Sequence, residues 1–173
     1  MTRPATGPRV VLVGPMGAGK TTVAALLAER WGVGVRDTDA DVEARAGKPV
    51  PEIFVDDGEP RFRELERGAV AAAIAEHDGV LALGGGAVLA PETQRLLAGR
   101  TVVFLRVGLA DAVARVGLGT GRPLLLGNVR ARVKQLLDER TPTYEAVATL
   151  IVDTDGRTPE DVAARIIEEL DEK

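Results

Sequence analysis

The chain of 173 residues is long enough for one domain with a sizeable core, and its composition, 45% hydrophobic and 28% charged, is ordinary for a globular protein. The net charge of −4 argues against broad nucleic-acid binding, and the absence of cysteine excludes disulfides and thiolate chemistry. The sequence has no apolar run of about 18 residues and its first residues lack the apolar stretch of a signal peptide, so we expect a cytoplasmic protein that binds neither nucleic acid nor a membrane.

Hydrophobic periodicity predicts strands that alternate with helices along the whole chain. We expect strands at residues 9–13, 33–36, 80–83, 101–107 and 150–152. We expect helices at residues 22–31, 41–46, 51–56, 60–76, 91–98, 129–140 and 159–170. This alternation indicates an α/β fold with a mostly parallel sheet covered on both faces. No repeat or linker divides the chain, so we expect a single domain over residues 1–173.

The first strand is followed by GPMGAGKT, residues 14–21, which fits the pattern G-x-x-x-x-G-K-[ST]. Glycines at these positions let backbone N–H groups surround phosphate oxygens, and the following helix adds its positive end. Lys20 can reach the β- and γ-phosphates, and the Thr21 hydroxyl can ligate Mg²⁺. Lysine is rare in this arginine-rich chain, which suggests that position 20 requires it. The alternative is a glycine-rich turn that binds nothing.

Three aspartates, Asp37, Asp39 and Asp41, follow the second expected strand. Residues two apart on an extended segment point the same way, so we expect these carboxylates to line one wall of the crevice at the strand ends. One carboxylate can hold Mg²⁺ through water, and another can accept a proton from a hydroxyl. The alternative is capping of the next helix, which Asp41 fits best.

The remaining polar motifs are less specific. RFRELE, residues 61–66, is by itself typical of a solvated helix face, although a guanidinium is the usual clamp for a carboxylate. LALGGGAV, residues 81–88, has more glycine than a turn needs, which suggests a small molecule lying on the backbone. The glycine- and arginine-rich stretch around 117–127 is the candidate for a mobile lid. Its Arg122 either reaches a transferring phosphoryl group or lies in solvent, and Arg140 falls at an expected helix end.

Taken together, GPMGAGKTT, DTDADVE, IFVDDGEPRFRELE, LGGGAV, GRPLL and RTPTY, in this order, closely resemble shikimate kinases. The resemblance runs from about residue 10 to residue 155. It implies transfer of the γ-phosphoryl group of ATP, with Mg²⁺, to the 3-hydroxyl of shikimate in aromatic amino-acid biosynthesis. The implied fold is a three-layer α/β/α domain of the P-loop nucleoside-monophosphate-kinase type with a five-stranded parallel sheet. A substrate-binding helical region at about 38–66 and a lid at about 115–128 are also implied.

The resemblance assigns roles to the matching residues. The catalytic residues would be Lys20, Asp39 and Arg122. The nucleotide would be bound by Gly14, Gly17, Ala18, Gly19, Lys20, Thr21, Thr22, Arg115, Arg122 and Arg157. Shikimate would be bound by Asp39, Arg63, Gly84, Gly85, Gly86 and Arg140. Mg²⁺ would be held by Thr21 and, through water, by Asp37. Glu66 would orient Arg63 by an ion pair.

Two other interpretations stay open from the sequence. A related kinase would act on gluconate or on a nucleoside monophosphate, but a polyol would not require two arginines facing one carboxylate. A non-catalytic nucleotide-binding module is the second interpretation, and the presence of Lys20, Thr21, Asp37, Asp39 and Arg122 argues against it. No apolar stripe stands out, so we expect a monomer.

Overall fold

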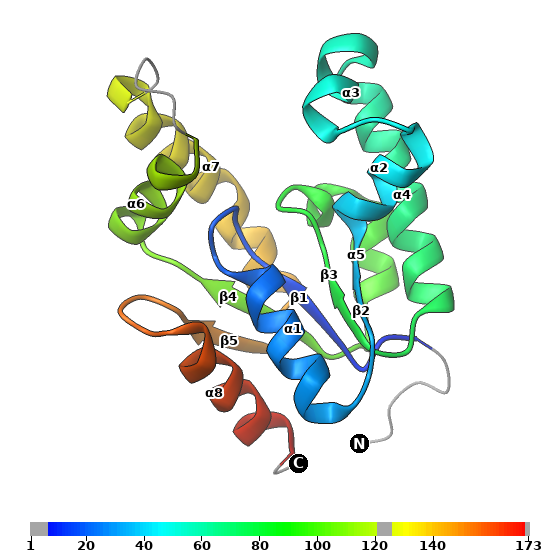
Figure 1. The fold of residues 1–173 in the computed structure, drawn as a ribbon, viewed down its shortest axis with the longest axis vertical. Helices are drawn as coiled ribbons and strands as arrows, with labels where there is room; N and C mark the ends of the chain where they lie inside the picture. The colour runs from blue at the N-terminus through cyan, green and yellow to red at the C-terminus, as the bar shows by residue number, and fades with distance from the viewer. Residues whose placement is uncertain (1–6, 121–125, 172–173) are drawn as a thin grey trace.

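The computed structural model describes residues 7–120 and 126–171, with the backbone alone at 116–120 and 126–128 (Figure 1). A parallel sheet of five strands, in the order β2-β3-β1-β4-β5, forms its centre. The strands are β1 (Val10–Val13), β2 (Val35–Asp37), β3 (Val80–Ala82), β4 (Val102–Arg106) and β5 (Leu150–Asp153). The five expected strands are therefore confirmed, with small shifts at their ends.

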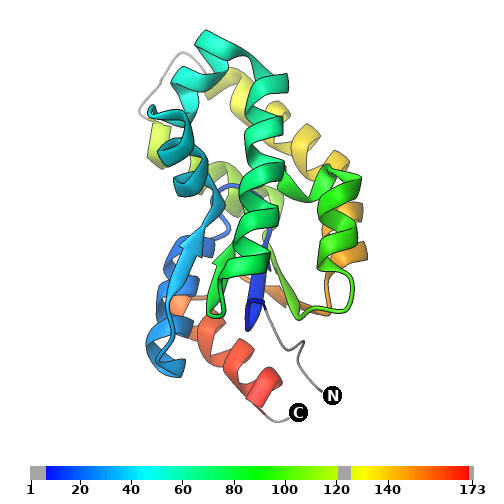
Figure 2. The ribbon, with the colours of Figure 1, turned by 90° about the vertical axis from the view of Figure 1, so that its right-hand side faces the viewer.

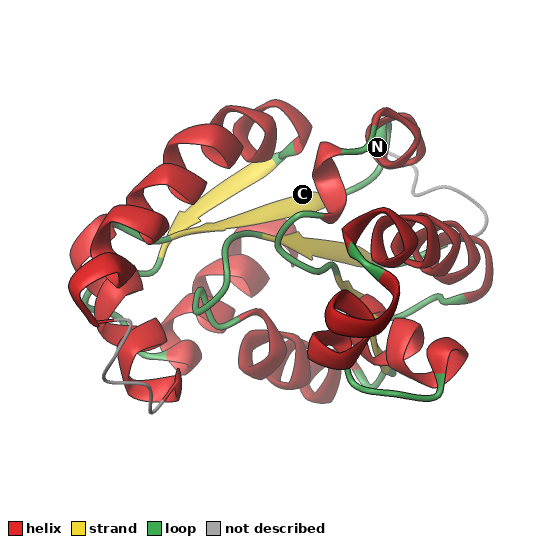
Figure 3. Cartoon of the chain, turned by 90° about the horizontal axis from the view of Figure 1, so that it is seen from above, coloured by secondary structure: helices red, strands yellow, loops and turns green. Residues whose placement is uncertain are grey.

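Helices cover both faces of the sheet (Figure 3). The helices are α1 (Lys20–Trp31), α2 (Thr38–Ala46), α3 (Val50–Asp57), α4 (Glu59–Glu76), α5 (Pro91–Leu97), α6 (Leu109–Thr120), α7 (Leu126–Val147) and α8 (Pro159–Asp171), with a short 3-10 helix η1 (Ala87–Leu89). The described helices include none that is long and apolar enough to cross a membrane.

The core has two layers because alternate strand residues face opposite sides. In β1, Val10 and Leu12 join the cluster that packs against α1 and α8, whereas Val11 and Val13 join the cluster that packs against α4 and α5. All four side chains are completely or almost completely buried. A sheet buried on both faces explains why the strands are continuous apolar runs rather than alternating ones.

A third, smaller core lies outside the sheet layers and joins α2, α3 and α4. Its buried members are Val42, Ile53, Phe62 and Ala69. These helices form an arm above the carboxyl ends of the strands, and the beginning of α7 rises opposite them (Figures 1 and 2). The arm and α7 therefore flank the space above the sheet edge.

Two helical regions differ from the expectation. The end expected for α7 at residue 140 is wrong, because the helix continues through Pro142 to Val147. An internal proline costs about 3 kcal/mol, but the following turn buries Tyr144 against Phe104, with ring centroids 5.0 Å apart. Helix α6 was not expected, since its glycines at 117 and 119 are poor helix formers. The described ends of the expected lid are helical, and Arg122 lies outside the described residues.

Candidate active site

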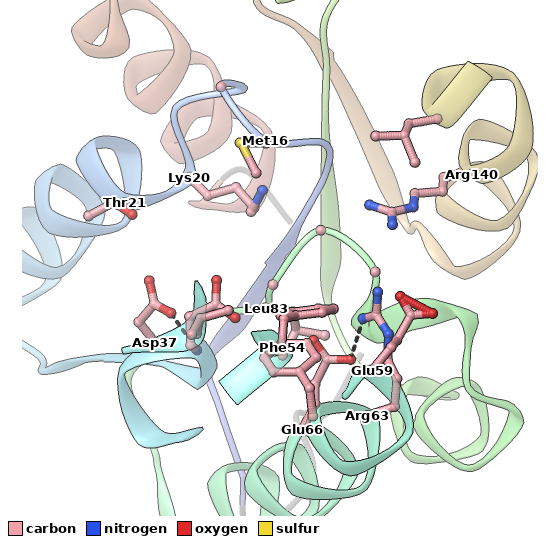
Figure 4. Close-up of a pocket in the computed structure, with 18 of the residues that line it drawn as sticks. Met16, Lys20, Thr21, Asp37, Phe54, Glu59, Arg63, Glu66, Leu83 and Arg140 are labelled. Carbon is pink, nitrogen blue, oxygen red and sulfur yellow. Dashed lines mark hydrogen bonds and ion pairs between the residues drawn. The ribbon is translucent and has the colours of Figure 1, made fainter. Parts of the chain in front are cut away.

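A cleft of about 530 Å³ opens at the carboxyl ends of the strands (Figure 4). Its lining comes from the loop before α1, from the arm, from the loop after β3 and from α7. The lining residues are Met16, Gly17, Gly19, Lys20, Thr21, Thr22, Asp37, Asp39, Val50, Phe54, Glu59, Phe62, Arg63, Glu66, Leu83, Gly84, Gly85, Gly86, Arg132, Leu136 and Arg140. This is where a parallel α/β sheet is expected to bind its ligand.

The loop at residues 14–19 is tightly constrained. Gly14 and Gly19 adopt φ angles of +150° and +92°, which side chains rarely tolerate. A Cβ atom at Gly14 would also lie 2.7 Å from the carbonyl oxygen of Leu105, at the end of β4. The glycines are therefore needed to turn the chain tightly between β1 and α1 beside the neighbouring strand.

Lys20, the first residue of α1, folds back over this loop. Its ammonium group donates hydrogen bonds to the carbonyl oxygens of Gly14 at 2.6 Å and Pro15 at 2.9 Å. Burial lowers the pKa of Lys20 to about 8, although the carboxylates of Asp39 and Asp37 oppose this shift. A cation is thus held in the cleft at the start of a helix, where the helix dipole also favours anions.

The aspartates after β2 are arranged differently from the expectation. They do not continue an extended segment, because α2 begins at Thr38. Asp37 is the N-cap and accepts a hydrogen bond from the backbone N–H of Asp39 at 2.8 Å, so the interpretation that Asp41 caps the helix is wrong. Asp41 instead pairs with Arg36 at 2.7 Å and does not line the cleft. Asp37 and Asp39 do line it.

The Asp39 side chain is partly buried where it lines the cleft. Burial raises the pKa of Asp39, the nearby Asp37 raises it further, and Lys20 opposes both effects. The glycine loop after β3 contacts the first turn of α2, since the backbone N–H of Gly84 donates a hydrogen bond to the Thr38 hydroxyl at 3.1 Å. A carboxylate with a raised pKa beside a fixed cation is suited to accept a proton.

The three glycines after β3 leave room for side chains that come from elsewhere. A Cβ at Gly84 would lie 2.6 Å from a carboxylate oxygen of Asp39, and one at Gly86 would lie 2.6 Å from the guanidinium of Arg63. A Cβ at Gly85 would lie 3.4 Å from the guanidinium of Arg140. The structure thus shows why these positions need glycine: a larger residue would collide with or crowd the side chains of Asp39, Arg63 and Arg140. The sequence did not reveal this reason.

Arg63 and Glu66 form an ion pair at 2.8 Å within α4. The Glu66 side chain is nearly inaccessible, so the interpretation of RFRELE as a solvated face is wrong for this pair. Burial raises the pKa of Glu66, whereas its hydrogen bond from Arg63 lowers it. The solvated interpretation holds for the exposed pair Arg61–Glu64, which is also 2.8 Å apart.

Arg140 lies in the interior of α7, across the cleft from Arg63 (Figure 4). One turn later on the same helix, the Tyr144 hydroxyl donates a hydrogen bond to the carbonyl oxygen of Gly85. This contact joins α7 to the glycine loop and places Arg140 beside it. Two guanidinium groups from different elements therefore face one space.

Arg115 and Arg157, which the sequence assigned to the nucleotide, are placed differently in the structure. Arg115 donates to the carbonyl oxygen of Gly17 at 2.9 Å and to the hydroxyl of the buried Thr154 at 3.2 Å, so it connects the loop before α1 to the end of β5. Arg157 is exposed in the loop between β5 and α8 and does not line the cleft. Thr154 belongs to no recognisable motif, so its contact with Arg115 was not predicted from the sequence.

Several lining residues received no role from the sequence, among them Glu59 on α4 and Arg132 and Leu136 on α7. Helical spacing is the signal that connects them to the assigned residues. Glu59 precedes Glu66 by two turns on the same face of α4. Arg132 and Leu136 precede Arg140 at intervals of four residues on α7.

The donors suited to a metal ion are few. The described residues contain no group of three or more His, Cys, Asp or Glu that would hold a metal ion by itself. Thr21 and Asp37 line the same side of the cleft (Figure 4). One hydroxyl and one carboxylate suit Mg²⁺, which usually keeps several waters and takes its other ligands from phosphates.

Comparison with known proteins identifies close relatives. The shikimate kinase family matches residues 16–171. A shikimate kinase from Salinispora arenicola is 64% identical over 159 residues, which cover 92% of this chain and 95% of that protein. A shikimate kinase from Thermobifida fusca is 60% identical over 163 residues, covering 94% and 95%.

Solved structures of shikimate kinases have the same fold as this chain. Shikimate kinase from Acinetobacter baumannii in complex with shikimate superposes with a TM-score of 0.88 at 33% identity, covering 97% of this chain and 94% of that one. Shikimate kinase from Aquifex aeolicus gives a TM-score of 0.79 at 29% identity, covering 95% and 96%. The expected P-loop kinase fold is confirmed.

Proposed function

The chain belongs to the shikimate kinase family, and we propose that its cleft binds Mg-ATP against α1 and shikimate against α4 and α7. The enzyme transfers the γ-phosphoryl group of ATP to the 3-hydroxyl of shikimate, giving shikimate 3-phosphate and ADP. The observation that carries the site assignment is that one cleft is lined by the cations Lys20, Arg63 and Arg140 together with the carboxylate of Asp39.

On the nucleotide side, we assign the phosphates of ATP to the backbone N–H groups of Gly14, Gly17, Ala18, Gly19, Lys20, Thr21 and Thr22. The Lys20 ammonium supports this assignment, because it lies over the loop and its hydrogen bonds to described residues go to two carbonyl oxygens of that loop. Arg115 and Arg157 are assigned to the adenine, since both lie near the β5 end of the sheet. The assignment of Arg122 to the phosphates stays a prediction from the resemblance.

Mg²⁺ would be held by the Thr21 hydroxyl and, through water, by Asp37. When bound, the ion neutralises charge on the transferred phosphoryl group and its leaving oxygen. The hydrogen bond from the Asp39 N–H fixes the Asp37 carboxylate at the helix start. That bond leaves the remaining lone pairs of Asp37 available to a water molecule.

On the substrate side, we assign the shikimate carboxylate to Arg63 and Arg140, whose forked guanidinium groups match a carboxylate. Glu66 orients Arg63 through the 2.8 Å ion pair. The Gly84, Gly85 and Gly86 backbone would form the floor beneath the ring. Asp39 would hold the substrate hydroxyls and accept the proton of the 3-hydroxyl as its oxygen bonds to phosphorus and ADP leaves.

We further propose that the enzyme acts as a cytoplasmic monomer. The chain has no cysteine, so it needs no oxidising compartment in which to form disulfides. The described exposed hydrophobic residues support a monomer because they are scattered over separate elements rather than gathered in one stripe. A gluconate or nucleoside-monophosphate substrate has less support, because the family model and the close relatives are shikimate kinases.

The proposed function is tested by ADP release from Mg-ATP with and without shikimate, with gluconate and a nucleoside monophosphate as control substrates. We expect release that depends on shikimate alone. If release depended on a control substrate instead, the assignment of Arg63 and Arg140 to the shikimate carboxylate would be wrong. Release without any second substrate, or none at all, would contradict the assigned transfer reaction.

A further inference from the structure

Helix α4 presents two carboxylates to the cleft, and only one has a partner. Glu59 and Glu66 lie two turns apart on one face of the helix, with Arg63 between them, and all three line the cleft. Glu66 is buried and paired with Arg63 at 2.8 Å. The exposed side chain of Glu59 makes no ion pair or hydrogen bond to any described residue. Glu59 is therefore a free anion at the rim of the substrate side.

The two arginines assigned to the substrate carboxylate show the same asymmetry. Arg63 is oriented by Glu66, but no described carboxylate lies within ion-pair distance of Arg140. Figure 4 shows Glu59 and Arg63 together on one side of the pocket and Arg140 on the opposite side, on α7. The Glu59 carboxylate, which has no described partner, and the Arg140 guanidinium, which interacts with the Tyr144 hydroxyl but with no described carboxylate, thus lie on opposite sides of the substrate space.

The arm that carries Glu59 has its own small hydrophobic core. The end of α4 stays packed in a sheet layer through Val70, Ala73 and Ile74, but its beginning, with Glu59, belongs to the separate small core, so this end of the arm can tilt towards α7. Such a shift would shorten the distance between Glu59 and Arg140. A guanidinium has five N–H donors, so it can bind two carboxylates along different edges.

We propose that Glu59 is a positioning residue for Arg140: the two pair across the cleft when shikimate is bound. One edge of Arg140 then holds Glu59, and another edge holds the substrate carboxylate. This arrangement mirrors Arg63, which is held by Glu66. Arg132 also lines the cleft, but it is exposed, and pairs in solvent contribute little. The inference rests on the proposed substrate role of Arg140.

The first test compares Glu59→Gln with Glu64→Gln, a matched control on α4 whose exposed carboxylate pairs only with Arg61. For Glu59→Gln we expect the KM for shikimate to rise about five- to tenfold, as loss of one charge-assisted contact predicts. The KM for ATP should stay unchanged. The Tm without ligand should fall only slightly, through loss of a favourable charge in the first turn of α4, whereas the Tm increase caused by shikimate should shrink. The control should change none of these values.

The second test combines Glu59→Gln with Arg140→Lys or with Arg132→Gln. A lysine keeps the charge but cannot bridge two carboxylates in the same way. If Glu59 and Arg140 are coupled, Glu59→Gln should raise the KM for shikimate less than about twofold in the Arg140→Lys protein. In the Arg132→Gln protein, Glu59→Gln should raise this KM as much as it does alone.

Two results would overturn the pairing: an unchanged or lower KM for shikimate in Glu59→Gln, or coupling to Arg132 instead of Arg140. The proposed function is judged separately by the KM for shikimate of Arg140→Lys alone. If that KM rises while Glu59→Gln has no effect, only the Glu59 inference fails.

Discussion

The two sides of the cleft are built in different ways. The nucleotide side comes mainly from one continuous segment, residues 14–22, whose backbone and first helical turn supply most of the binding groups. The substrate side is assembled from four elements: Asp39 on α2, Arg63 on α4, the glycine loop after β3, and Arg140 on α7. Under the proposed assignment, a local backbone turn recognises phosphate, whereas the carboxylate clamp depends on tertiary packing.

This difference predicts that single substitutions separate the two sides. Removing the ammonium group by Lys20→Ala should reduce kcat/KM by about a thousandfold or more, because phosphoryl transfer depends mainly on electrostatic stabilisation. The protein should remain folded, since the described hydrogen bonds of Lys20 go to two carbonyl oxygens of its own loop and not to a distant element. Steady-state assays and circular dichroism check both statements. Near-normal turnover would exclude Lys20 from phosphate binding.

Asp39 lies where the two sides meet, and its loss should affect the chemical step. For Asp39→Asn we expect kcat to fall about 10²- to 10³-fold, in the range for a general base. The amide keeps the shape of the side chain but cannot take the proton, so shikimate binding should weaken much less. Single-turnover rates and shikimate titrations separate these effects. A fall in binding as large as the fall in rate would make Asp39 a positioning group only.

The proposed function assigns Arg63 to the substrate side alone. Arg63→Ala should raise the KM for shikimate about thirtyfold or more, the effect expected for a lost charged hydrogen-bonding group. The KM for ATP should change little. The substitution also leaves the buried Glu66 without its partner, so the Tm should fall, whereas Arg61→Ala should leave both values unchanged. Equal effects on the two ligands would remove Arg63 from the carboxylate clamp.

The pH dependence should be confined to the nucleotide side. Burial lowers the pKa of Lys20 to about 8 in the free protein. Lys20 is therefore mostly protonated below this pH and loses its charge as the pH rises through it. We expect the affinity for Mg-ATP to fall about tenfold between pH 7 and pH 9, with shikimate affinity nearly constant. Calorimetric titrations measure both, and a flat ATP profile would contradict a depressed pKa for Lys20.

The same difference explains what the sequence could predict. The loop at 14–21 is a contiguous pattern between a strand and a helix, so its type and position were evident, as was the alternation of strands and helices. The order of the strands around β1 and the assembly of the clamp depend on tertiary packing. The clamp residues were identified from the family resemblance, because Arg63 and Arg140 alone look like ordinary surface arginines.

The errors have local physical causes. Asp37 and Asp41 are both plausible caps, and the choice depends on where β2 stops pairing with β3. Pro142 predicts a helix end, but burial of Tyr144 on the sheet outweighs the loss of one backbone hydrogen bond. Glu66 looks solvated in the sequence because its burial depends on contacts with the glycine loop and Arg63.

The most direct measurement is a set of calorimetric titrations in which Lys20→Ala and Arg63→Ala are each titrated with shikimate and with a non-hydrolysable Mg-ATP analogue. The account predicts that Lys20→Ala loses affinity for the nucleotide and keeps it for shikimate, and that Arg63→Ala does the reverse. Comparable losses for both ligands in both variants would contradict a cleft with two separately built sides.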